Sequence, residues 1–194
     1  MSRWVRDIKL TPAQEQELLR RNPAYNRQLS GTAIQAANRR SERRAYQEEG
    51  RSLARQGDSI HVAGCMLYWA EGEKDRNALR FYNSDPEMVR FFVFFLKKYF
   101  DLRDEEIKIT CNLFADHVQR QREVEQFWLD VAQLSARSLC KSYVNVYSKH
   151  SKKKRTNRLP YGTVRVTVSR TRVIQSIYGS IQQYVGFERE AWLE

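Results

Sequence analysis

The hydrophobic pattern of this sequence changes at residue 60, and that change limits the fold more than any other feature. From residue 60 to residue 185, apolar side chains recur at helical and strand spacing, whereas residues 28–56 are polar and rich in arginine. A chain of 194 residues can bury one sizeable core. The sequence therefore predicts one domain over residues 59–194, preceded by a basic helical arm or linker over residues 1–58.

The arm carries only weak structural signals. Residues 13–21 predict a short helix that ends before Pro23, because the residue preceding a proline is pushed out of the helical region. Residues 28–56 form either a long exposed helix or partly disordered chain, since Ile34 and Leu53 offer only a thin apolar face.

The domain alternates between helical and strand periodicity. Gly72 is expected to end the first helix in a left-handed conformation, and Ser84 with Glu87 predicts a capping box for the second. The expected elements, in chain order, are helix 60–70, strand 79–83, helix 85–99, strand 107–114, helix 119–134, a short strand at 144–147, strand 163–168 and helix 171–185.

The formal net charge of +11 lies entirely in one segment. No Asp or Glu occurs between Asp130 and Glu188, while the same interval holds 11 basic residues. Contacts from Lys and Arg to phosphate supply the sequence-independent part of nucleic-acid binding, so the segment predicts a nucleic-acid partner. A solvated basic loop, or a site for acidic lipid or protein, is the alternative. The residues expected to bind nucleic acid are Lys141, Lys149, Lys152, Lys153, Lys154, Arg155, Arg158, Arg165 and Arg172.

Several other classes of protein are disfavoured. Three widely separated cysteines provide neither a disulfide framework nor a CxxC metal site, and no GxGxxG or GxxxxGK[ST] motif is present. The three histidines are isolated and receive no role. No apolar run is long enough to cross a membrane, and the first ten residues carry charges where a signal peptide would be apolar. We therefore expect a cytoplasmic protein with no membrane partner.

The residues Gly64-Cys65-Met66-Leu67-Tyr68-Trp69-Ala70-Glu71-Gly72 form the most informative motif. A small residue such as Gly64 lets an apolar helix approach a partner helix closely. Glu71 stands in the last turn, where a carboxylate meets the negative end of the helix macrodipole. A bound cation would reverse this unfavourable placement, so Glu71 is a candidate metal ligand.

These residues resemble a single-copy LAGLIDADG homing-endonuclease domain. Ala70-Glu71-Gly72 is similar to the end of the LAGLIDADG motif, and the segment from Arg80 to Met88 is similar to the strand and helix that follow it. The strand at 163–168 and the helix at 171–185 resemble the closing elements of that family, so the likeness covers roughly two thirds of the chain. The fold implied is α+β, with helices packed on one face of a small, mostly antiparallel sheet.

The resemblance implies metal-dependent hydrolysis of duplex DNA by a homodimer, because each copy carries one motif. It implies that Glu71 is catalytic and holds Mg²⁺, and that Arg170 is the basic catalytic residue, with Arg172 as a poorer match. Gly64, Leu67 and Tyr68 are the implied contacts between the two copies.

Two other functions remain open. A non-catalytic, DNA-binding regulator on the same fold, similar to the sporulation regulators of the WhiA type, is the alternative. It is favoured by the seven residues between Gly72 and Arg80, too few for the long hairpin with which the nucleases read DNA. An RNA-binding module is the third reading. Separately, Ser2 to Asp7 resemble the end of a helix-turn-helix recognition helix, which implies either a remnant of that motif or a disordered tail.

Overall fold

The computed structural model of the chain describes residues 9–21, 23–145 and 159–193, and it divides the chain into two compact units, residues 1–42 and 43–194. The first unit contains helix α1 (Pro12–Arg21) and the beginning of helix α2 (Pro23–Ala54). The helical alternative for residues 28–56 is therefore confirmed. The resemblance of residues 2–7 to a recognition helix falls outside the described residues.

A four-stranded sheet forms the centre of the second unit. Its strands are β1 (Leu79–Asn83), β2 (Ile107–Phe114), β3 (Tyr143–Asn145) and β4 (Thr163–Val168), in the spatial order β1-β4-β2-β3. Strand β4 runs antiparallel to both β1 and β2, whereas β3 runs parallel to β2. The prediction of an α+β fold with a mostly antiparallel sheet is thus confirmed at the level of fold class.

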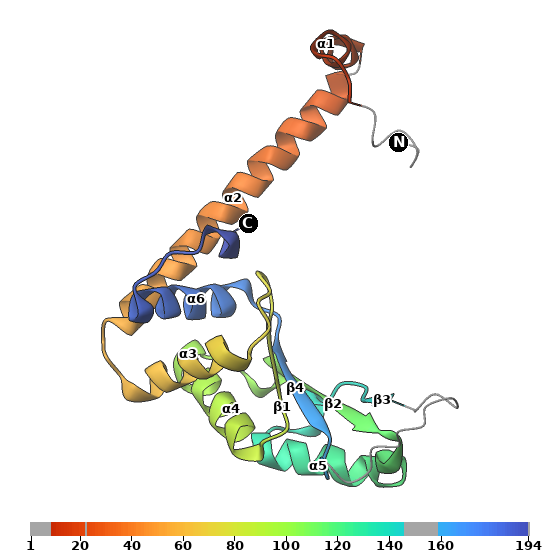
Figure 1. Cartoon of the computed structure of the whole chain (residues 1–194), viewed down its shortest axis with the longest axis vertical. Helices are drawn as coiled ribbons and strands as arrows, with labels where there is room; N and C mark the ends of the chain where they lie inside the picture. Colours follow the sequence, from red (N-terminus) through yellow and green to blue (C-terminus); the bar gives the residue numbers. More distant parts are fainter. Residues whose placement is uncertain (1–8, 22, 146–158, 194) are drawn as a thin grey trace. The chain divides into compact units, whose positions relative to one another are not determined.

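Four helices of the second unit lie on one side of this sheet (Figure 1). They are α3 (Ser59–Glu71), α4 (Pro86–Phe100), α5 (Gln121–Ala132) and α6 (Thr171–Val185). Short 3-10 turns connect helices α4 and α5 to the neighbouring strands. One of these turns, Ala115–Arg120, replaces the first two residues of the helix predicted at 119–134. Within the described residues, no helix combines the length and the apolar character needed to cross a membrane.

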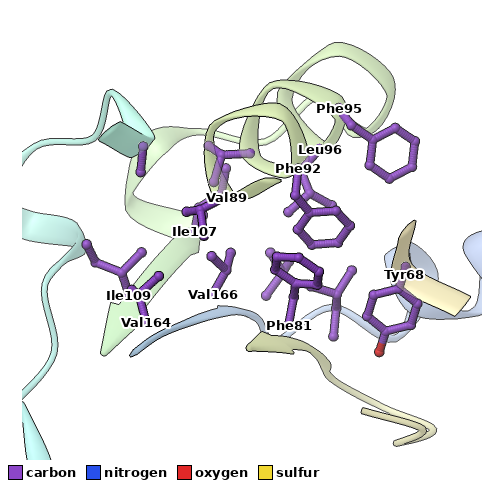
Figure 2. Close-up of a cluster of buried hydrophobic side chains, with 14 of the residues drawn as sticks. Tyr68, Phe81, Val89, Phe92, Phe95, Leu96, Ile107, Ile109, Val164 and Val166 are labelled. Atoms are coloured by element: carbon purple, nitrogen blue, oxygen red, sulfur yellow. The ribbon is translucent and has the colours of Figure 1, made fainter. Parts of the chain in front are cut away.

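The core fills the space between the sheet and the helices (Figure 2). Phe81 of β1 stacks on Phe92 of α4 with ring centroids 4.2 Å apart, and Phe92 in turn lies 5.9 Å from Tyr68 of α3. All three side chains are fully buried, as is Val166 of β4. Each buried side chain of this size stabilises the fold by about 1.5–3 kcal/mol.

Two predictions about helix ends are wrong. The N-cap of α4 is Asp85 rather than Ser84, because Pro86 occupies the first helical position, and the Asp85 carboxylate accepts hydrogen bonds from the amides of Glu87 and Met88. Gly72 is extended rather than left-handed, since the chain turns directly into an antiparallel bridge with Phe81. A Cβ atom at Gly72 would collide with the ring of Tyr68, which explains the glycine.

The second half of α2 falls within the second compact unit, which begins at residue 43, whereas the sequence predicts a domain that begins at residue 59. Helices α2 and α6 cross closely at Gly50 and Gly179, where an added Cβ would meet the backbone of the opposite helix. Beside this crossing, Gln47 donates to Gln175 (2.8 Å) and accepts from Gln182 (3.0 Å), and all three side chains are buried. Polar residues therefore make this contact, which the hydrophobic pattern does not reveal.

Two of the three histidines are buried within the domain. The Nδ1 atom of His61 lies 2.6 Å from the hydroxyl of Tyr184, and burial lowers the pKa of His61 below its usual value. The Nδ1 atom of His117 accepts a hydrogen bond from the amide of Phe114. These contacts agree with a structural position for both residues, while His150 lies outside the described residues.

Candidate nucleic-acid interface

The face of the sheet that points away from the helices carries polar side chains. Along β4, Val164, Val166 and Val168 are fully buried, while the alternate residues Thr163 and Arg165 are partly exposed. This alternation follows from the two-residue period of a strand that is covered on one side only. We call this surface the open face, and its described members are Arg80, Tyr82, Lys108, Thr110, Asn112, Tyr143, Thr163, Arg165 and Thr167.

Arg165 occupies the middle of the open face. It lies directly opposite Tyr82 of β1 and Thr110 of β2 in the strand register. Its guanidinium carbon is 5.9 Å from the ring centroids of both Tyr82 and Tyr143, so the charged group is held by two aromatic rings. Its Nη2 atom donates to the Thr110 hydroxyl at 3.3 Å, and its Nη1 atom donates to the Tyr82 hydroxyl at 3.5 Å.

The charge of Arg165 is held in place without a counter-ion. Among the described residues it forms no ion pair, and its Nε atom is buried without a hydrogen-bond acceptor. The hydrogen bond to Tyr82 raises the pKa of the guanidinium above its usual value, at which an arginine side chain is already charged at physiological pH. A fixed, unneutralised arginine with donors to spare is suited to an anionic ligand such as phosphate.

The other charged residues of the open face are also basic. Arg80 and Lys108 both lie opposite Thr167, which is two residues after Arg165 in β4 and on the same face. Arg80 is neutralised by Glu73 (3.0 Å) and Asp75 (2.8 Å), whereas Lys108 donates to the uncharged carbonyl of Arg137 (2.7 Å). The outward-facing positions of the described strands hold no acid, although Glu73 and Asp75 bring negative charge next to Arg80.

The structure describes only some of the predicted nucleic-acid-binding residues. Arg165 is on the open face, and Lys141 is exposed just before β3. Arg172 pairs with Glu49 (2.7 Å) in the first turn of α6, so it does not belong to this surface. The remaining residues, Lys149, Lys152, Lys153, Lys154, Arg155 and Arg158, lie outside the described residues.

The basic residues from Lys149 to Arg158, which we call the basic segment, are joined to the described chain next to the open face. The described chain stops at Asn145 in β3 and resumes at Leu159, shortly before β4. At this end of the sheet Asn112 pairs with both Tyr143 and Thr163. Both flanks of the basic segment are therefore attached at the same end of the sheet as these open-face residues.

Glu71 lies at the edge of the same surface. It is the last residue of α3, it is exposed, and it precedes Gly72, which bridges to Phe81. Phe81 is followed in β1 by Tyr82, the partner of Arg165. Glu71 therefore lies where the chain passes from α3 to the edge of the sheet.

Arg170 is the N-cap of α6, two residues beyond the end of β4. Its guanidinium group pairs with Glu106, which also accepts from Arg103. Among the described residues, the ion pair of Arg170 is therefore with Glu106 and not with Glu71.

The last turn of α3 already has a cation. The Lys74 ammonium donates to the carbonyl oxygens of Tyr68 (3.3 Å), Trp69 (2.9 Å) and Gly72 (2.5 Å). Mg²⁺ requires several oxygen ligands in a near-octahedral arrangement, and the nearby carbonyls that could join Glu71 are taken by this lysine. The described residues also contain no cluster of three or more His, Cys, Asp or Glu side chains suited to a metal. The residues of a single chain therefore do not fit Mg²⁺ at this position.

The residues implied as contacts between two copies are mostly occupied within the chain. Gly64 is buried against Phe95 of α4, and Tyr68 is fully buried beside Phe92. Both residues serve the packing of α3 on α4, so neither is available to a second copy. Leu67 is only partly buried against the core.

The exposed side of α3 holds a different set of residues. Ala63 and Ala70 are exposed on either side of Leu67, which forms a stripe of small and apolar residues at helical spacing. These positions are more accessible to a second copy than Gly64 and Tyr68.

Several residues of this site were not identified from the sequence. Tyr82 and Thr110 fall within predicted strands, but only the strand order places them beside Arg165. Tyr143 precedes the strand predicted at 144–147, and Lys74 lies in a loop. The alternation of β4 alone already puts Arg165 opposite to its buried valines, and this signal could have singled it out.

Comparison with protein-family models, with curated proteins and with solved structures gives no match for this chain. The resemblance to a LAGLIDADG domain therefore stays a prediction, and the function is argued from the geometry of the site.

Proposed function

We propose that this chain is a DNA-binding protein that contacts duplex DNA through the open face and the adjoining basic segment. The observation that carries the proposal is Arg165, a guanidinium held between two tyrosine rings on a surface whose other charged residues are basic. Phosphate contacts from such groups provide most of the affinity of proteins for DNA. The rings of Tyr82 and Tyr143 flank the arginine, which favours a phosphate clamp over a platform for stacking single-stranded bases.

We favour a regulator that binds DNA without cutting it. The support is Lys74, whose ammonium group holds the carbonyls beside Glu71. The LAGLIDADG endonuclease, with Mg²⁺ at Glu71, is the second candidate because Glu71 is exposed and the next residue, Gly72, bridges to β1. In that candidate, the second copy of a homodimer would have to contribute further ligands.

We also propose that two copies pair through the stripe of α3 formed by the exposed Ala63 and Ala70 and the partly buried Leu67. Small residues on this stripe permit close helix packing, and a two-fold arrangement would present two open faces to one duplex. Sedimentation equilibrium would distinguish the 23.1 kDa chain from a dimer of twice that mass.

The proposal predicts tight, salt-dependent binding to duplex DNA. Fluorescence anisotropy with a short labelled duplex should give an affinity that falls steeply with added salt, because counter-ions are released from the phosphates. A single-stranded RNA of the same sequence serves as the control and should bind more weakly. Stronger binding to the RNA would instead support the RNA-binding alternative.

The same protein should leave supercoiled plasmid intact in the presence of Mg²⁺ or Mn²⁺. Metal-dependent nicking that is lost in Glu71→Gln would contradict the regulator and establish the endonuclease. The Glu71→Gln protein should bind the labelled duplex as tightly as the unchanged protein, since under either candidate Glu71 does not contact phosphate directly.

A further inference from the structure

We propose that Lys74 is the built-in cation of the α3 C-terminus and that its ammonium group takes the position that a divalent metal would need beside Glu71. The inference rests on the geometry around Lys74 and does not depend on the proposed binding of DNA. It assigns a role to a residue in the loop between α3 and β1.

The end of α3 concentrates negative charge. The last carbonyls of a helix have no partner within the helix and form the negative end of its macrodipole. Glu71 adds a full negative charge in the same turn. A cation at this point is therefore strongly favoured, whether a metal ion or a side chain supplies it.

The ammonium group of Lys74 supplies this cation. A lysine ammonium has three donors, and the three carbonyl oxygens of Tyr68, Trp69 and Gly72 lie 3.3, 2.9 and 2.5 Å from its Nζ atom. Desolvation and then the charge of Arg189 hold the pKa of Lys74 below its usual value, and the charge of Glu71 opposes this shift. The three carbonyl oxygens accept hydrogen bonds from the ammonium form of Lys74, which is the form that the helix end requires.

The local chain path holds Lys74 in place. After Gly72 the chain runs antiparallel to β1, with the amide of Glu73 donating to the carbonyl of Arg80 at 2.9 Å. The Tyr68 hydroxyl donates to the carbonyl of Glu73, and the Lys74 ammonium lies 5.5 Å from the Tyr68 ring centroid. The loop therefore returns Lys74 to the helix that it has just left.

A divalent ion and this ammonium group exclude each other. Both would use the same carbonyl oxygens, and two cations a few ångströms apart repel each other. The nearby positive charge of Arg189 adds to this repulsion. Removal of the Lys74 charge should consequently expose a cation site made of Glu71 and the last carbonyls of α3.

The test measures binding of Tb³⁺, an oxygen-seeking ion that serves as a luminescent probe for divalent cations. Trp69 lies two residues before Glu71 and is 38% exposed, so it is placed to sensitise a bound Tb³⁺ ion. We expect Lys74→Met to bind Tb³⁺ at least ten times more tightly than the unchanged protein. The double variant Lys74→Met/Glu71→Gln should lose this gain, and Lys74→Arg, which keeps the charge, should show none.

Two outcomes would overturn the proposal. One is that Lys74→Met binds Tb³⁺ no more tightly than the unchanged protein while retaining its circular dichroism spectrum. The other needs no change at Lys74: if the unchanged protein binds Tb³⁺ and Glu71→Gln abolishes that binding, then a metal site already exists beside the lysine. Equal, weak binding by the unchanged protein and Glu71→Gln supports the proposal even if Lys74→Met fails to fold.

Discussion

Replacing Gly179 by alanine is expected to lower the free energy of unfolding by about 3 kcal/mol, the upper end of the range for overpacked positions. The new Cβ would meet the backbone carbonyl of Gln47, which cannot rotate away as a flexible side chain could. Relief requires α2 and α6 to separate, and this would stretch the buried hydrogen bonds of Gln47 with Gln175 and Gln182. Urea unfolding followed by tryptophan fluorescence measures the loss, since Trp192 stacks on Tyr178 of α6 at 4.1 Å.

The matched control is Gly31→Ala in the first part of α2. No atom lies within 4 Å of a Cβ built at Gly31, so this change should be neutral or slightly stabilising, as is usual for glycine in a helix. Gly50→Ala should resemble Gly179→Ala because its Cβ would meet the Ser176 backbone. The double variant should cost less than the sum, since both changes widen one crossing. A Gly179→Ala protein as stable as Gly31→Ala would show that the helices do not cross this closely.

The second large effect is expected at Arg165. Charge reversal in Arg165→Glu should weaken binding to duplex DNA about 100-fold, equivalent to about 2.7 kcal/mol, because a positioned phosphate contact is replaced by repulsion. The milder Arg165→Lys should also lose affinity, since an ammonium group cannot keep both the Thr110 bond and the fit between two rings. Anisotropy titrations at constant salt give both values.

Arg90→Glu is the control for net charge. Arg90 lies on α4, on the side of the sheet covered by helices, and it pairs with Glu87 at 3.0 Å. The change in net charge is the same as in Arg165→Glu, so a nonspecific effect of charge would weaken both variants equally. Equal losses, in folded proteins of similar melting temperature, would remove Arg165 from the interface.

Much of the fold could be predicted because local periodicity reports local structure. The alternation at residues 163–168 and the helical spacing around Val173 and Ile177 mark β4 and α6 with nearly their observed bounds. The order of the strands could not be predicted in the same way. It depends on pairings such as Tyr82 with Arg165, between residues far apart in the sequence, and a pattern within one strand carries no information about its neighbour.

The candidate site could be predicted only in part, for similar reasons. The charge of the segment predicted an anionic partner and included Arg165, but the ion pair of Arg170 with Glu106 depends on the tertiary structure and could not be predicted. The unfavourable position of Glu71 was recognised from the sequence, yet its compensation by Lys74 depends on the path of the chain after Gly72. The contact of Gln47 with α6 could not be predicted, because polar side chains make it and no apolar pattern in the sequence marks it.

Site-specific photo-crosslinking tests the central claim, that the open face contacts duplex DNA, most directly. A benzophenone side chain would replace Tyr143, which is 60% exposed on the open face, or Phe94, which is 50% exposed on α4 among the helices. Irradiation with a labelled duplex should crosslink the protein carrying the probe at position 143 and leave the protein with the probe at position 94 uncrosslinked. Crosslinking at position 94 alone would contradict the proposed interface and place the DNA on the helical side of the domain.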